Sequence, residues 1–202
     1  MLTLQYAAIQ WARWEKRLDP VCANYTPRCW WESDVVGVTR ARFWHEIEVK
    51  TSASDFRRDF LKDDFWVGMR KHEILGMLYS GKEPDFEEIA ERTCRPVRLI
   101  REKWARMRRP NYFWFCVPRV LLPKIMAKIP RYAGILTLEP STYQSCPSVE
   151  RPPARLHDGK VDLKFENAIS RALAFRYHRL LDKIQRKQWE KEAAAAEDTA
   201  NV

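Results

Sequence analysis

The chain has 202 residues, of which 36 are Lys or Arg and 27 are Asp or Glu, and its formal net charge is +9. This length fits one domain with at most a small insertion. Apolar residues make up 46% of the chain, which is too much for a disordered protein and enough for a sizeable core. No apolar run approaches the roughly 20 residues that a membrane span requires, so we expect no membrane partner.

The cysteines and the distribution of charge narrow the class of protein further. The five Cys residues form no C-x-x-C pair, so the sequence indicates neither a disulfide framework nor a structural zinc site. The excess of basic residues is consistent with binding to nucleic acid, with attraction to an anionic membrane surface, or with solubility alone. Residues 189–202 hold one Lys and four acids, so the rest of the chain is more basic than the total. We expect one domain over residues 1–188, followed by a disordered acidic, Ala-rich tail.

The first half of the chain predicts a helix, a hairpin and a long helical segment. Apolar residues at three- and four-residue steps predict a helix over residues 2–18 that packs on a sheet. A turn-rich stretch over 19–28 leads to a strand over 29–38, and a short connection gives a second, antiparallel strand over 43–52. Residues 52–81 predict helix, stopped by the glycine at the end of that range.

The second half predicts two more strands and a helical end. Short apolar runs over 112–117 and 133–138 are bounded by proline and predict buried strands. Residues 162–192 predict one or two final helices. The order of elements therefore predicts an α/β or α+β domain with a mixed sheet flanked by helices.

A segment over about residues 60–109 interrupts this order as a helical insertion. Within it, residues 85–109 predict two short helices that meet at a tight turn at Thr93 and Cys94, as in a helix-turn-helix. The second helix and its exit carry seven cations within 15 residues, a density suited to phosphate contact. The candidate DNA-binding residues are these seven and one from the preceding helix: Arg95, Arg98, Arg101, Lys103, Arg106, Arg108, Arg109 and Lys71. A solvated basic face on a helical hairpin is an equally open interpretation.

Polar residues on the predicted hairpin form a candidate metal site. Strand alternation puts Glu46, Glu48 and Lys50 on one face, and the hairpin brings Asp34 of the first strand alongside Glu48. Opposed carboxylates suit Mg²⁺ or Mn²⁺, and a lysine beside the ion could position or deprotonate an attacking water. Ser52 is a further candidate for phosphate or metal contact, although Ser at this junction is first of all a helix N-cap. Cross-strand salt bridges on a solvated hairpin are the alternative.

These residues carry a resemblance to a known superfamily. Asp34 followed by Glu48-Val49-Lys50, after a helix and before TSASDFRRDF, resembles the PD-(D/E)XK nucleases. More narrowly, EVKTSASDFRRDF, KHE at 71–73, NYFWFCVP and PRYAGILTL resemble a bacterial and phage group of MmcB-like predicted DNA-repair nucleases. The similarity covers about residues 1–140.

The resemblance implies a restriction-endonuclease-like fold for this chain. It implies Asp34 and Glu48 as ligands of Mg²⁺ or Mn²⁺, and Lys50 as the catalytic lysine. Glu32 fits an acid often seen just before the aspartate, and Glu15 is the candidate for a glutamate that the first helix supplies in some members. It also implies a cytoplasmic protein of a bacterium or of a phage-infected host cell.

Three functions follow as hypotheses. The first is a metal-dependent DNA endonuclease or exonuclease that hydrolyses phosphodiester bonds in DNA repair or phage DNA metabolism. The second is a catalytically inactive DNA-binding or regulatory protein that uses the inserted helix-turn-helix. The third is an interaction protein whose basic surface meets a protein partner. The sequence leaves open the form of the substrate and the oligomeric state, a dimer included.

Overall fold

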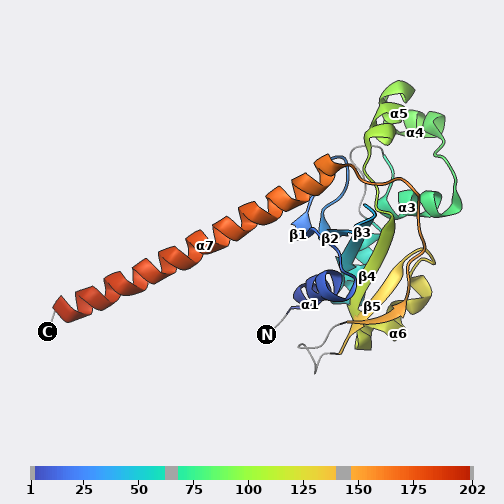
Figure 1. Ribbon diagram of the computed structural model, residues 1–202. Helices are drawn as coiled ribbons and strands as arrows, with labels where there is room; N and C mark the ends of the chain where they lie inside the picture. Colours follow the sequence, from blue (N-terminus) through green and yellow to red (C-terminus); the bar gives the residue numbers. More distant parts are fainter. Residues whose placement is uncertain (1–2, 62–67, 140–146, 201–202) are drawn as a thin grey trace.

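The protein folds around one mixed six-stranded sheet with helices on both faces (Figure 1). The computed structural model describes residues 3–61, 68–139 and 147–200. The strands lie in chain order across the sheet, and they are β1 (Val21–Tyr25), β2 (Ser33–Val38), β3 (Trp44–Val49), β4 (Tyr112–Pro118), β5 (Gly134–Leu138) and β6 (Ser148–Arg151). Strands β1 to β3 and the pair β5–β6 are antiparallel, whereas β3, β4 and β5 run parallel. The predicted class, a mixed sheet flanked by helices, is confirmed.

Helices precede, interrupt and follow the sheet. They are α1 (Leu4–Gln10), continued by a π-helical segment (Trp11–Glu15), α2 (Ala53–Asp59), α3 (Lys71–Ser80), α4 (Phe86–Thr93), α5 (Val97–Arg106), α6 (Leu122–Ile125) and α7 (Leu163–Ala200). Short 3₁₀ turns flank α6, at Arg119–Leu121 and Met126–Lys128. Among the residues that the structure describes, no helix is long and apolar enough to cross a membrane.

The sheet separates two apolar layers. On one face, the buried alanines of α1 and Trp11 of the π-helical segment pack against Val35, Ile47 and Trp114. On the other face lies the larger layer, which includes Trp44 and Phe115. Because alternate residues of a strand point to opposite faces, Glu46 and Glu48 of β3 lie on the side of the larger layer, as the sequence predicts.

Local signals explain where the helices begin and end near the site. The Ser52 hydroxyl accepts a hydrogen bond from the backbone N–H of Asp55 and so caps the start of α2. Gly81 ends α3 in the left-handed conformation, with φ of 65°, as the predicted stop requires. Cys94, with φ of 52°, adopts the same conformation between α4 and α5, a position that a glycine would fill without strain.

Several boundaries differ from the predictions. Strand β1 lies inside the stretch predicted as turn-rich, because pairing with β2 and burial of Val21 and Cys22 outweigh the turn residues around it. The single helix predicted over 52–81 is two helices, and its residues 62–67 lie outside the described residues. Strand β6 was not predicted, since its side chains are largely exposed and carry no apolar pattern.

The C-terminal helix also differs from the prediction. Helix α7 is continuous through residue 200, whereas the sequence predicts a disordered tail from residue 189. Ala, Glu and Lys are strong helix formers, so the composition that suggests a solvated tail also favours helix. Phe165 and Ile169 anchor its first turns in the core, and beyond them α7 extends away from the sheet (Figure 1).

Candidate functional site

The site is built first from the hairpin of β2 and β3. The register pairs Val35 with Ile47 and Val36 with Glu46, so the next position along the ladder sets Asp34 beside Glu48. One carboxylate oxygen of Asp34, Oδ2, accepts the backbone N–H of Val49 at 2.7 Å. The predicted alignment of Asp34 with the Glu48–Lys50 segment is therefore confirmed.

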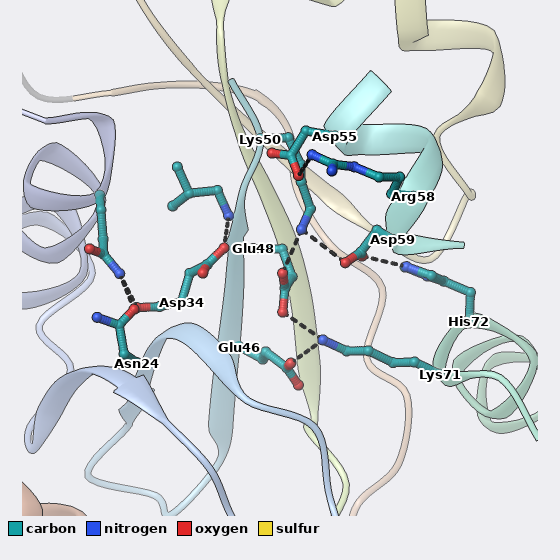
Figure 2. A network of polar contacts seen from close by, with 12 residues as sticks. Asn24, Asp34, Glu46, Glu48, Lys50, Asp55, Arg58, Asp59, Lys71 and His72 are labelled. Carbon is teal, nitrogen blue, oxygen red and sulfur yellow. Dashed lines mark hydrogen bonds and ion pairs between the residues drawn. The ribbon is translucent and has the colours of Figure 1, made fainter. Parts of the chain in front are cut away.

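Glu48 lies between two lysines (Figure 2). The Nζ atom of Lys50 lies 2.8 Å from its Oε2, and the Nζ atom of Lys71, from the first turn of α3, lies 2.6 Å from its Oε1. Glu48 and Lys71 are each only 1% exposed. Both oxygens of the Glu48 carboxylate are thus held by an ammonium group in a buried setting.

The same two lysines connect two further carboxylates. Lys50 also donates to Asp59 Oδ1 at 2.9 Å, from the end of α2. Lys71 lies 2.5 Å from Oε1 of Glu46, whose other oxygen accepts the indole N–H of Trp30 at 2.7 Å. The result is one buried polar network on the larger-layer face of the sheet, to which β3, α2 and α3 each contribute.

A histidine and a tyrosine close the network at Asp59. His72 Nε2 lies 2.8 Å from Asp59 Oδ2, and His72 Nδ1 lies 2.7 Å from the hydroxyl of Tyr132. Burial lowers the pKa of His72, so its ring is neutral near pH 7. The Asp59 carboxylate can only accept a hydrogen bond, so the ring proton lies on Nε2 and is donated to Asp59. Nδ1 then carries no proton and accepts a hydrogen bond from the Tyr132 hydroxyl. This chain fixes the Asp59 carboxylate beside Lys50.

Asp34 differs electrostatically from the other carboxylates. Burial, together with the charge of Glu48, raises the pKa of Asp34 from 3.8 to about 6, against the opposing hydrogen bond from Val49 and the charges of the lysines. Asp34 is therefore ionised at pH 7 at an energetic cost. Its second oxygen, Oδ1, has no hydrogen-bond partner in the described part of the chain.

The other groups in the network keep their charges. Burial opposes ionisation of Glu48, but Lys71 and Lys50 together hold its pKa below the usual range. Burial opposes protonation of both lysines as well, yet the neighbouring carboxylates raise their pKa values above normal. Glu46 is the exception, because burial raises its pKa despite Lys71.

Two carboxylates could hold a divalent cation here. Mg²⁺ commonly uses one or two protein carboxylates and completes its shell with water and substrate oxygens, which Asp34 and Glu48 can supply from adjacent strands. Among residues 3–61, 68–139 and 147–200, no group of three or more His, Cys, Asp or Glu side chains is arranged to hold a metal ion. Glu48 would also have to share its oxygens with the lysines that now hold them.

Sequence reasoning missed part of this network. Asp59 and His72 both lie within the motifs quoted for the family resemblance, but nothing in their spacing predicts that a histidine on α3 reaches the end of α2. Lys71 was predicted to contact the DNA backbone, and the structure places it inside the network. Its ammonium group is buried between two glutamates, so it is not on the surface that a phosphate would meet.

The remaining candidates of the hairpin and first helix lie outside the network. Glu15 is exposed on the helical segment that covers the opposite face of the sheet, and Glu32 is exposed just before β2. Ser52 acts as the N-cap of α2. From the first helix it is Gln5 that approaches the site, where its amide donates to the backbone carbonyl of Asp34 at 2.9 Å.

The predicted DNA-binding residues of the insertion lie on α5 or next to one of its ends. Arg98 has an 85% exposed side chain with Glu102 at 3.8 Å, and Arg101 pairs with Glu87 at 2.9 Å. Arg106 is exposed. After the helix, Arg108 pairs with Asp162, and Arg109 stacks on Trp104 at 4.6 Å from the ring centre. Arg95 is half-buried, as is Lys103 on α5.

Comparison with known proteins adds little to this geometry. No protein-family model matches the sequence, and no curated protein matches it. Among solved structures, the chain is similar to SPO1766, a protein of unknown function from Silicibacter pomeroyi, with 13% sequence identity and a TM-score of 0.44 over 82% of this chain and 78% of that one. A likeness of this degree indicates neither an activity nor a ligand.

Proposed function

We propose that the protein is a metal-dependent nuclease that hydrolyses phosphodiester bonds of DNA. The observation that carries the proposal is the placement of Asp34 beside Glu48, with Lys50 next to them, in a network with more acids than cations. That network contains four carboxylates, from Asp34, Glu46, Glu48 and Asp59, and two ammonium groups, from Lys50 and Lys71. A divalent cation would offset this excess of carboxyl groups over ammonium groups.

The residues present fit Mg²⁺ or Mn²⁺. Asp34 offers an oxygen with no partner in the described residues, and a positive charge beside it would oppose the burial and the charge of Glu48, which raise its pKa. Glu48 offers the opposing carboxylate. When bound, such an ion supplies Lewis-acid polarisation of the phosphate and lowers the pKa of a bound water.

Lys50 acts in this scheme as a charged donor. Its pKa is raised by Glu48 and Asp59 against the effect of burial, so it stays protonated at neutral pH and is a poor base. We propose that its ammonium group donates to a non-bridging phosphate oxygen and stabilises the charge that develops there. Asp59, held by His72, keeps this ammonium group in place.

The insertion would hold the substrate. We propose that α4 and α5 act as a helix-turn-helix on a restriction-endonuclease-like core, with the exposed Arg98 and Arg106 on the phosphate backbone. The sharp left-handed turn at Cys94 and the exposure of α5 support this proposal.

Cleavage assays test the proposal directly. Purified protein, plasmid and single-stranded DNA are incubated with Mg²⁺ or Mn²⁺, and Glu48→Gln and Lys50→Met are each expected to abolish cleavage. Glu83→Gln and Lys82→Met are matched controls, because both residues are exposed and lie outside the network. Circular dichroism checks that each variant is folded. Cleavage that persists in folded Glu48→Gln would overturn the proposal.

A second candidate function has its own supporting observation. Both oxygens of Glu48 are already held by lysines, which is the arrangement expected of a site that stabilises the fold without binding metal. The protein would then bind DNA through the insertion without cutting it. Mobility shifts that need no divalent ion and survive EDTA, together with no cleavage under any metal, would favour this function over the first.

A further inference from the structure

A basic cavity lies at the far end of β3 from the carboxylate network. It has a volume of about 420 Å³ and opens between the exit of α5 and residues 157–162. Its lining includes Trp44, Arg106, Arg108, Arg109, Lys160 and Asp162. We propose that this cavity, called the α5 cavity below, binds the phosphate group of a nucleotide, either free or within a nucleic-acid strand.

The charge of the α5 cavity favours an anion. Four of its lining side chains are cationic and one is a carboxylate, which is already paired with Arg108 at 3.0 and 3.2 Å. Arg106, Arg109 and Lys160 have no carboxylate partner anywhere in the described part of the chain. Burial lowers the pKa of the lining His157, which is therefore neutral near pH 7. A phosphate would supply the missing counter-charge.

The walls of the α5 cavity are fixed by buried hydrogen bonds. The side chain of Asn111, which is fully buried, accepts the backbone N–H of Trp44 at 2.8 Å and donates to the carbonyl oxygens of Gly159 at 2.7 Å and His157 at 3.0 Å. The backbone N–H of Val161 donates to the carbonyl of Arg42 at 2.9 Å. The backbone of the segment that carries Lys160 is thus tied to the start of β3, so this wall of the cavity is in place before a ligand arrives.

The remaining lining suits the rest of a nucleotide. Trp44, Leu78, Met107 and Val161 give the cavity apolar surface, and its volume lies within the range usual for small-molecule sites. The indole N–H of Trp44 is buried and has no acceptor among the described residues. A ligand oxygen that reached this N–H would supply the missing acceptor.

This inference extends the proposed nuclease function, and it depends on that function for the identity of the ligand as part of a nucleic-acid substrate. Trp44 and Glu48 are four residues apart on one strand, about 13 Å by the usual rise of a strand, so the α5 cavity is separate from the metal-site residues. A phosphate in the cavity would belong to a different nucleotide from the one that is cut. The cavity would therefore fix where along a strand cleavage occurs.

Calorimetric titration in EDTA tests the binding without the metal reaction. The probes are inorganic phosphate, deoxyadenosine monophosphate and a single-stranded oligonucleotide, each titrated into the full chain. The double variant Arg106→Ala, Lys160→Ala is expected to weaken binding by about tenfold or more, because each cation makes a charge-assisted contact. The matched control is Arg131→Ala, Lys124→Ala, which removes the same number of charges from exposed positions outside the cavity and should change binding less than about twofold. Both double variants should fold, since all four residues are exposed and have no ion-pair partner in the described residues.

The three probes distinguish a phosphate of a free nucleotide from a phosphate within a nucleic-acid strand. Saturable binding of the monophosphate indicates a free nucleotide, and binding of the oligonucleotide alone indicates a strand; each supports the inference if the cavity variant loses it. Equal loss in the control variant, or no binding of any probe, would overturn the inference. Glu48→Gln should bind as the parent does, so failure of the nuclease proposal is distinguished from failure of this one.

Discussion

Replacement of Asp34 by Asn should stabilise the protein while it abolishes the proposed activity. The Asn side-chain oxygen can still accept the backbone N–H of Val49, as Oδ2 of Asp34 does at 2.7 Å. The substitution removes only the charge. In the folded protein, burial and the neighbouring Glu48 disfavour that charge, and they raise the pKa of Asp34 from 3.8 to about 6.

The magnitude and the sign follow from proton linkage. A pKa that rises from 3.8 to about 6 corresponds to about 3 kcal/mol, and we expect about 1–2 kcal/mol because the half-buried carboxylate is partly screened by solvent. The folded state holds the proton more tightly than the unfolded state does. The cost is therefore absent below pH 3.8, grows as the pH rises and is complete above about pH 6. Asp34→Asn should match the parent at low pH and exceed it at pH 8.

Urea unfolding at pH 4.5 and pH 8 tests this prediction, because the larger part of the cost arises between these two pH values and the gain should be clearly smaller at pH 4.5. The control is Asp182→Asn, on the exposed part of α7, which should leave the free energy of unfolding unchanged within about 0.5 kcal/mol at both pH values. The electrostatic account fails if Asp34→Asn lowers the stability at pH 8. It also fails if the gain is the same at both pH values, because a gain independent of pH would not come from the charge.

Three further predictions test the metal site, the network and the sheet. Adding Mg²⁺ at pH 8 should raise the Tm of the parent in calorimetry, and Asp34→Asn should lose most of this shift; equal shifts would exclude Asp34 as a ligand. Lys71→Met removes an ammonium group from two buried glutamates, leaves Glu46 without a cationic partner, and should cost about 3–5 kcal/mol in urea unfolding. Adding Glu46→Gln should restore part of that loss, and no recovery would show that the two residues are not coupled. Gly134→Ala should cost about 1–3 kcal/mol in the same assay, because the added methyl group overlaps the indole of Trp114, and a neutral result would contradict the close approach of β5 to that ring.

The sequence predicts the hairpin and which side chains share one of its faces, because side chains alternate between the two faces along a strand and neighbouring residues reveal this alternation. Alternation sets Glu46, Glu48 and Lys50 on one face, and the short connection between strands aligns Asp34 with them. The glycine that stops α3 and the serine that caps α2 are equally local. These features therefore follow from residues within a few positions of one another.

The partners of the hairpin residues could not be predicted in this way. Lys71 is 23 positions from Glu48, and Tyr132 is 60 positions from His72. Their contacts depend on how α3 and the end of the β4–β5 connection pack over the sheet, which no local pattern specifies. A lysine next to a helix start predicts a solvated cation, and only the packing shows that Lys71 is buried. The same holds for β1, which is defined by its pairing with β2.

The contacts of Lys71 bear on both candidate functions, the metal-dependent nuclease and the DNA-binding protein without cleavage. Lys71 contacts both Glu48, at 2.6 Å, and Glu46, at 2.5 Å. If Glu48 turned one oxygen toward a cation beside Asp34, Lys71 would keep a carboxylate partner in Glu46, so its buried charge would not be left unpaired. Lys50 would likewise keep Asp59 at 2.9 Å. Each lysine would therefore keep one carboxylate partner if Glu48 turned toward a cation, and in this respect the closed network is compatible with a metal site.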